Sequence, residues 1–235
     1  MRLEFLQSSL ASRVIIALLI YVSCSAFSER KERPVIAPTR AADQIEKTST
    51  PSSPIPPRPQ ILSRQVWKAN DAIGKMQSHT IQHITVHHTA SPQKSGVALE
   101  KKMQSLQRFS QSESRLASGK IKPAWGDVPY HFYIAANGQI AEGREIEYVG
   151  DTNTDYDPRG HALIVLEGNF ENEQPSTKQL ESLRELVAWL SAKYEIPVAE
   201  IKGHNDYAST ACPGVNLKKE LPALRQRVAE IRGLR

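Results

Sequence analysis

The strongest constraint on the fold is the run His-Ala-Leu-Ile-Val-Leu at residues 161–166. Such a near-continuous apolar run is typical of a central strand in a sheet with both faces covered. Asn137-Gly138 is among the strongest hairpin signals that a sequence offers, and it predicts a short strand on either side of it. These two strands are expected at residues 130–134 and 139–143. A further strand is expected at residues 83–88, which contain a β-branched run near residue 85.

Helical periodicity alternates with these strands. Apolar residues recur at helical spacing in three segments, which predicts helices over residues 96–114, from Pro175 to about residue 190, and over residues 217–231. Ser176 or Thr177 can cap the second helix. We therefore expect an α/β fold, a single domain with a mixed central β-sheet flanked by helices.

Residues 1–26 are predicted to be a signal peptide. Two arginines precede an apolar run at residues 14–22, and small residues follow it. The uncharged stretch ends at Glu29, which is short for a membrane span of about 20 residues and favours cleavage. Two alternatives stay open: lipidation of Cys24, which would give a lipoprotein with a membrane tether, and an uncleaved anchor.

Residues 27–60 are predicted to be a disordered linker. The segment is rich in Pro, Ser, Thr and charge, so it cannot bury enough apolar surface to offset the entropy of ordering. Its prolines favour an extended chain that holds the domain at residues 61–235 away from a membrane. A docking site for a partner is the alternative.

The composition restricts the class of partner. A chain of 235 residues suffices for one domain with appendages. Its net charge is +5, and its lysines and arginines are scattered without interleaved aromatic residues, so no nucleic-acid surface is expected. A mildly basic surface suits another anionic polymer, such as a carboxylate-bearing cell wall.

The stretch G-H-N-D-Y-A-S-T-A-C-P-G at residues 203–214 carries metal-binding chemistry. His204 and Cys212 lie in a segment without apolar periodicity, so both can converge on one point from a loop. Zinc binds imidazole nitrogen and thiolate sulfur, and a catalytic zinc keeps three protein ligands and one open position. The third ligand is expected from the strand at residues 84–89, which ends in histidines. A plain buried cysteine is the alternative for Cys212.

Four motifs then resemble a known family. They are V-H-H-T-A at 86–90, P-Y-H-F at 129–132, G-x-I-x-E-G-R at 138–144, and G-H-x-D with T-x-C-P-G at 203–214. Together they are similar to the zinc N-acetylmuramoyl-L-alanine amidases, a family that includes phage lysozymes and the peptidoglycan recognition proteins. The match spans about residues 80 to 218, with the motifs in the family's order. It implies a single domain of the amidase/peptidoglycan recognition type.

The resemblance implies one zinc ion (Zn²⁺) per chain, with His87, His204 and Cys212 as the metal ligands. His87 matches the first histidine of the family's pair, and strand geometry points His88 to the opposite face. Tyr130 matches the active-site tyrosine, whose hydroxyl can donate a hydrogen bond to negative charge as it develops.

Further site residues follow from the same resemblance. Thr210 stands where some members carry lysine and others threonine. A lysine would bring a positive charge to the tetrahedral intermediate, whereas threonine offers only a neutral hydrogen-bond donor. Glu167 interrupts an apolar strand, and some relatives carry a carboxylate on this strand in a register that differs by two residues. It is expected to act as general base or substrate contact, the alternative being a strand-end glutamate that faces solvent. His131 and His161 are expected to be structural.

The loop at residues 149–160 departs from members that place a histidine near Thr152. Asn153 and Arg159 remain as candidate substrate-binding residues for the peptide stem. Arginine could pair bidentately with a diaminopimelate carboxylate.

The implied function is zinc-dependent hydrolysis of the amide between N-acetylmuramic acid and L-alanine, in peptidoglycan or its fragments (muropeptides). The expected enzyme is an exported monomer in the periplasm or cell envelope, and it would serve cell-wall degradation, remodelling or recycling. One alternative is a non-catalytic peptidoglycan-binding module, although such members usually lack the cysteine ligand. A structural or redox zinc protein is another, and it needs a fourth ligand, for which Asp206 is the only nearby candidate.

Overall fold

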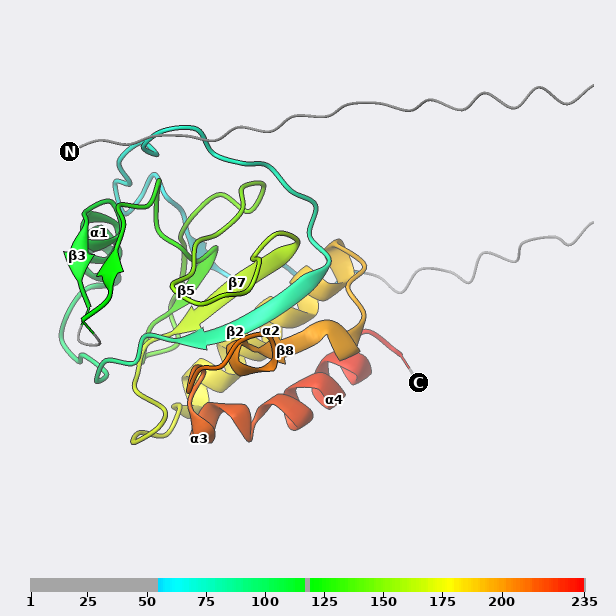
Figure 1. Cartoon of the computed structure of the whole chain (residues 1–235). Coiled ribbons are helices and arrows are strands. Elements are labelled where there is room, and N and C mark those ends of the chain that lie inside the picture. Colours follow the sequence, from blue (N-terminus) through cyan, green and yellow to red (C-terminus); the bar gives the residue numbers. More distant parts are fainter. Residues whose placement is uncertain (1–54, 117–118, 235) are drawn as a thin grey trace, which may run out of the picture. The chain divides into compact units, whose positions relative to one another are not determined.

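The computed structural model describes residues 55–116 and 119–234 (Figure 1). The predicted signal peptide at residues 1–26, with Cys24, and the predicted linker up to residue 54 lie outside the described residues. Within the two described ranges, the helices are too short or too polar to cross a membrane.

A six-stranded sheet forms the centre, in the order β1-β6-β5-β7-β2-β8. β7 pairs in parallel with both β5 and β2, whereas β5 and β6 form an antiparallel hairpin around Asn137-Gly138. The sheet is therefore mixed, and the predicted α/β fold and hairpin are confirmed. Its strands are β1 (Ile61–Leu62), β2 (His83–His88), β5 (Phe132–Ile134), β6 (Ile140–Glu142), β7 (His161–Leu166) and β8 (Ile201–Gly203).

Helices cover both faces of this sheet (Figure 1). The capping of α2 by Ser176 is confirmed: the Ser176 hydroxyl accepts a hydrogen bond from the Gln179 amide, and the Gln179 side chain accepts one from the Ser176 amide. The helices are α1 (Leu99–Ser110), α2 (Thr177–Lys193), the 3-10 turns η1 (Val198–Glu200) and η2 (His204–Asp206), α3 (Val215–Lys218) and α4 (Leu221–Ile231).

Two helix boundaries differ from the prediction, and one strand pair was not predicted. The helix expected over residues 217–231 is two helices, α3 and α4, because Pro222 lacks an amide hydrogen and favours the first turn of a new helix. Helix α1 is shorter than the expected 96–114. The polar stretch after α1 contains a small antiparallel pair, β3 (Ser114–Arg115) and β4 (Ile121–Lys122), which the sequence did not signal.

Alternation along the strands separates two cores. Ile84, Val86 and Ile164 face α2 and α4, in a cluster with Leu186 and Leu224. On the other face, Val165 and Tyr133 pack with Leu99 and Met103 of α1 and with Trp67. Because successive residues of a strand point to opposite faces, His87 shares the α1 side with Val165, whereas His88 points toward Phe170 on the other side.

His131, just before β5, links three segments through a fixed tautomer. Its Nδ1 accepts a hydrogen bond from the Leu163 amide at 2.8 Å, so its Nε2 carries the hydrogen and donates to the Tyr148 carbonyl at 2.9 Å. The imidazole is fully buried, and burial lowers the pKa of His131 to about 3. The predicted structural role of His131 agrees with these contacts.

This histidine should make stability depend on pH. The folded pKa lies below the unfolded value near 6.5, so below pH 6.5 the unfolded chain binds a proton that the native chain does not, and stability falls as pH falls toward 3. Between pH 7 and pH 5 this group should lower the free energy of unfolding by about 2 kcal/mol. In a His131→Asn variant, which keeps an acceptor for the Leu163 amide, chemical denaturation should show a loss smaller by that amount. An equal loss in both proteins would contradict the assignment.

Candidate metal centre

Parallel pairing of β2 with β8 brings two histidines together. The register pairs Val86 with Gly203, so the next residues, His87 and His204, lie side by side. Their ring centroids are 4.5 Å apart, and both side chains are buried. Two imidazoles that are 117 positions apart in the chain thus come from adjacent strand ends.

Cys212 reaches the same point through a tightly packed turn. Gly203 makes this approach possible, because a Cβ at that position would lie only 2.9 Å from Cδ of Pro213. The Asn205 amide donates to the Cys212 carbonyl at 2.9 Å, and the His88 amide donates to the Cys212 sulfur at 3.4 Å. The turn therefore holds the thiol against the end of β2.

The three predicted ligands form one cluster. One potential ligand atom from each of His87, His204 and Cys212 lies within 4.8 Å of the other two, and no further histidine, cysteine or carboxylate of the described residues joins the group. Sγ of Cys212 is 3.6 Å from Nδ1 of His87. The other ring nitrogen of His87, Nε2, is buried and has no hydrogen-bond partner among the described residues. This donor set of two nitrogens and one sulfur fits zinc and leaves one coordination position for a non-protein ligand.

Burial sets the protonation of these groups. It lowers the pKa of His87 well below its ordinary value, with the neighbouring His204 as a further cause, and lowers the pKa of His204 to about 4. Burial also raises the pKa of the Cys212 thiol to about 12, opposed by the hydrogen bond from the His88 amide. Neutral imidazoles offer lone pairs to a cation, and the thiol becomes a thiolate readily only when a cation compensates its charge.

Tyr130 lies beside the cluster, in the loop before β5 rather than in a strand as the sequence suggested. Its ring centroid is 5.2 Å from that of His87. Burial, followed by the nearby Cys212 sulfur, raises the pKa of Tyr130, so its hydroxyl keeps its hydrogen near neutral pH. The side chain is therefore a hydrogen-bond donor close to the candidate metal position.

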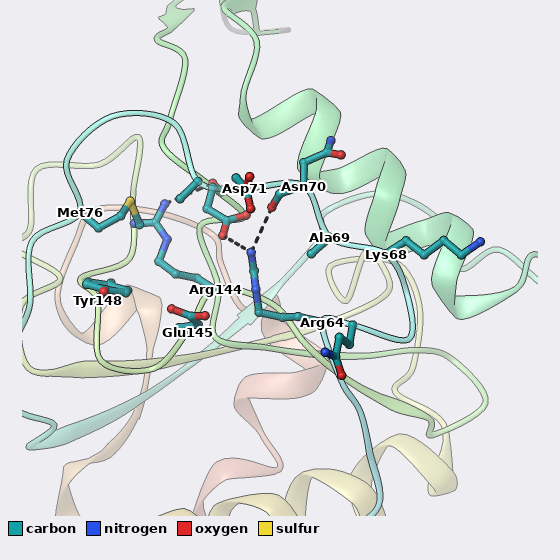
Figure 2. A pocket seen from close by; sticks show the side chains of 12 residues that line it. Arg64, Lys68, Ala69, Asn70, Asp71, Met76, Arg144, Glu145 and Tyr148 are labelled. Atoms are coloured by element: carbon teal, nitrogen blue, oxygen red, sulfur yellow. Dashed lines mark hydrogen bonds and ion pairs between the residues drawn. The ribbon is translucent and has the colours of Figure 1, made fainter.

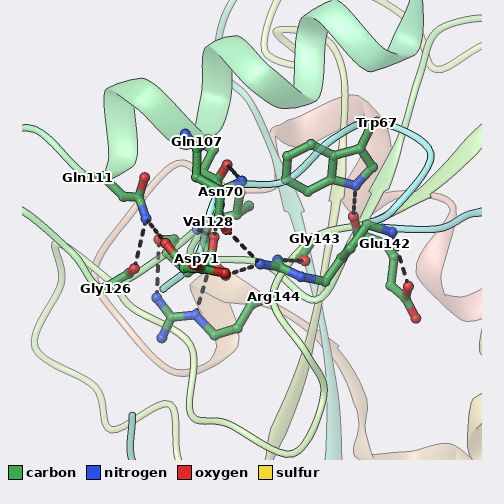
Figure 3. Close-up of polar contacts among 12 residues, drawn as sticks. Trp67, Asn70, Asp71, Gln107, Gln111, Gly126, Val128, Glu142, Gly143 and Arg144 are labelled. Carbon is green, nitrogen blue, oxygen red and sulfur yellow. Dashed lines mark hydrogen bonds and ion pairs between the residues drawn. The ribbon is translucent and has the colours of Figure 1, made fainter. Parts of the chain in front are cut away.

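The motif at residues 138–144 holds Tyr130 in place. A Cβ at Gly143 would lie only 2.2 Å from the Tyr130 carbonyl oxygen, so this position requires glycine. The Arg144 amide donates to the same carbonyl at 2.9 Å, and its buried guanidinium donates to the Val128 carbonyl at 2.9 Å. Figure 3 shows the Arg144 guanidinium next to Val128.

The other sequence-predicted residues fall into two groups. Thr210 belongs to the turn of the cluster, where its hydroxyl accepts a hydrogen bond from the Cys212 amide at 3.3 Å. Asn153 and Arg159 lie on the loop between β6 and β7. The Asn153 carbonyl accepts from the Lys120 ammonium at 2.7 Å, and the largely exposed Arg159 pairs with its neighbour Asp157.

Glu167 has a different environment from the one expected. Its buried carboxylate accepts hydrogen bonds from the Lys102 ammonium at 2.7 Å, the Lys94 amide at 3.1 Å and the Ala136 amide at 3.0 Å. The residue in register with His87 is Val165, two positions earlier. With its oxygens engaged by three donors, Glu167 is suited to join α1 to the sheet, and its role as general base or substrate contact stays a prediction.

Three further polar residues near the site are not part of the cluster. The His88 ring lies on the far face, where its Nδ1 accepts from the Phe170 amide at 3.3 Å. His161 pairs with the Thr85 hydroxyl at 2.7 Å. Asp206 accepts from the Gly203 amide at 2.9 Å and lies 3.3 Å from the Lys218 ammonium, so it is not part of the cluster.

Two residues of the site escaped the sequence analysis. The Thr154 hydroxyl is 2.8 Å from Nε2 of His204, and the ring centroid of Tyr156 is 5.1 Å from that of His204. Both belong to the polar loop between β6 and β7. An aromatic residue inside such a loop was the only available signal, because loop contacts have no periodicity.

A separate pocket of about 350 Å³ lies between the segment around Arg64 and the loop that contains Arg144 (Figure 2). Its two guanidinium groups are already engaged. Arg64 pairs with Asp127 at 2.8 Å and donates to the Asn70 carbonyl at 3.3 Å, and Arg144 donates to Val128. The pocket therefore has a structural character, and the metal cluster is the candidate functional site.

Comparison with known proteins identifies the family of this chain. The sequence model of the family described as N-acetylmuramoyl-L-alanine amidase matches residues 77–215. Peptidoglycan-recognition protein LB of Drosophila melanogaster is 29% identical over 167 residues, which are 68% of this chain and 67% of that protein.

Two solved structures extend the comparison. The endolysin N-acetylmuramoyl-L-alanine amidase LysCS of Clostridium intestinale has 26% identity and a TM-score of 0.56, over 72% of this chain and 96% of that chain. A variant of Drosophila PGRP-LB in complex with tracheal cytotoxin has 27% identity and a TM-score of 0.56, over 69% and 93% of the two chains. The predicted resemblance and fold type are confirmed.

Metal content should distinguish the paired histidines. A His87→Asn variant should lose zinc, because it removes a ligand, whereas His88→Asn should retain about one zinc per chain, because His88 faces the opposite core. Zinc would be measured by mass spectrometry after dialysis against a weak chelator. Equal zinc content in the two variants would contradict the assignment of His87.

Proposed function

Because the chain belongs to the N-acetylmuramoyl-L-alanine amidase family, we propose that it is a zinc-dependent enzyme. The proposed reaction is hydrolysis of the amide between N-acetylmuramic acid and L-alanine in peptidoglycan or its fragments. The family and its relatives limit the function to peptidoglycan amide hydrolysis or peptidoglycan recognition. The observation that favours hydrolysis is the complete cluster of His87, His204 and Cys212.

These three residues would hold the zinc. When bound, zinc supplies a Lewis acid for the scissile carbonyl and lowers the pKa of water to about 7, which provides a nucleophile near neutral pH. The closed packing of the Cys212 turn against β2 supports a preformed site, because Gly203 and the His88 amide already fix the thiol.

Tyr130 would donate a hydrogen bond to the substrate oxygen that gains negative charge. Its raised pKa keeps the phenol protonated, and it lies next to His87. Thr210, two residues before Cys212, supplies at most a neutral donor. Asn153 and Arg159 are proposed contacts for the peptide stem, since they lie on the loop that also carries Thr154.

Export is part of the proposal. Peptidoglycan lies outside the cytoplasmic membrane, and the predicted signal peptide at residues 1–26 would deliver the enzyme to the periplasm or cell envelope. Palmitate labelling of the wild type and of a Cys24→Ala variant separates a lipid-anchored form from a cleaved soluble form. Cytoplasmic accumulation of the full-length chain would contradict export.

Release of stem peptides tests the activity. The purified chain should release peptides that begin with L-alanine from muropeptides or sacculi, as measured by mass spectrometry. A strong chelator should abolish release, and added zinc should restore it. Binding to sacculi without release, with zinc present, would instead identify a recognition module.

Two conservative variants should separate a catalytic tyrosine from a structural carboxylate. Tyr130→Phe should lower kcat by about 10²–10³-fold with little change in stability, because one donor to the developing charge is lost. Glu167→Gln should lower stability, because it weakens a buried pair with Lys102, and should leave kcat within a few fold. Rates would be measured on soluble muropeptides and stability by thermal unfolding. The reverse pattern would support Glu167 as the general base.

A further inference from the structure

The loop between β6 and β7 reaches one metal ligand directly. Thr154 Oγ1 lies 2.8 Å from Nε2 of His204, and Thr152 Oγ1 lies 2.8 Å from Thr154 Oγ1. The Thr154 amide also donates to Thr152 Oγ1 at 3.1 Å. Two hydroxyls and one imidazole therefore form a continuous chain of hydrogen bonds.

The ring of His204 is confined on two sides. Its centroid is 4.5 Å from that of His87 and 5.1 Å from that of Tyr156. These contacts restrict the ring plane, but they do not distinguish the two ring orientations related by a half-turn. Among the described residues, only the hydrogen bond to Thr154 does so, because a half-turn would replace Nε2 by a carbon atom at that position.

We propose that Thr154 is a positioning residue that selects Nδ1 of His204 as the metal ligand. This inference rests on the metal site of the proposed function. A neutral imidazole bound to a cation through one nitrogen carries its hydrogen on the other, so Nε2 must be a donor in the metal-loaded protein. The Thr154 oxygen accepts that hydrogen, and its own hydroxyl then donates to Thr152.

The chain of hydrogen bonds therefore has one direction when the metal is bound. It runs from the His204 ring to Thr154 and from Thr154 to Thr152, whose oxygen also receives the Thr154 amide. Thr152 accepts the Thr154 hydroxyl hydrogen in this direction and can donate its own in the reverse one, while its oxygen receives the Thr154 amide in both. Without metal, the Thr154 hydroxyl can instead donate to an unprotonated Nε2, so the constraint on the tautomer arises on metal binding.

Zinc affinity tests the positioning role without reference to turnover. Competition with a chromophoric chelator at pH 7 should show about 10–100-fold weaker binding for Thr154→Val, which keeps the shape and removes the hydroxyl. Thr154→Ser should retain affinity within a few fold. Thr152→Val should show a smaller loss than Thr154→Val, because the direct bond to the ring remains. Equal affinity of Thr154→Val and wild type would overturn the proposal.

A second measurement is independent of protein stability. In the zinc-loaded wild type, nitrogen NMR of the histidine rings should show hydrogen on Nε2 of His204 and zinc on Nδ1. Coordination through Nε2 would overturn the proposal even if Thr154→Val bound zinc weakly. The metal-free forms of the wild type and Thr154→Val should unfold at similar temperatures, which would exclude general destabilisation as the cause.

The two proposals fail in different ways. Zinc binding by the wild type without release of stem peptides overturns the amidase proposal and leaves the role of Thr154 to be judged from affinity and NMR. Release of stem peptides with unchanged zinc affinity in Thr154→Val overturns only the positioning role. Absence of zinc binding by the wild type overturns both.

Discussion

The site depends on the parallel pairing of β2 with β8. His87 is the last residue but one of β2, and His204 directly follows β8, so the register that joins Val86 to Gly203 makes the two imidazoles neighbours. The backbone ladder therefore does most of the positioning, and a slip by one residue would turn one histidine to the opposite face. Because β2 lies between β7 and β8 in the sheet, this register is supported on both sides.

Protonation and metal binding are coupled at this position. Without a cation, the site holds two neutral imidazoles and a protonated thiol, because burial disfavours every charged form. Zinc would reverse this preference at Cys212 and release its proton to solvent. The same burial that makes an isolated thiolate costly thus selects for a bound divalent cation. Tyr130, which remains protonated, adds a donor without adding charge.

Residue chemistry made part of this site predictable. His204 and Cys212 share one polar stretch with zinc-compatible donors. Alternation along β2 puts His87 and His88 on opposite faces, and the resemblance to the amidase family selected His87. Glu167 was harder to assign, because alternation places it on the same face as Val165 but does not say which position lies opposite His87; pairing with β2 decides that. Thr154 was not predictable, since a contact between two loops depends on how the sheet brings them together. The break before Pro222 had a local signal that helical periodicity concealed.

Gly203 shows how such a centre can be lost without the loss of any ligand. The space where its side chain would be is taken by Pro213, so an added methyl group there would push the cysteine turn away from the histidines. A descendant of this chain that carried alanine at 203 would still display all three metal-binding side chains in its sequence. An inventory of ligands would still find a complete centre, although the added methyl group had shifted the turn that carries the thiol.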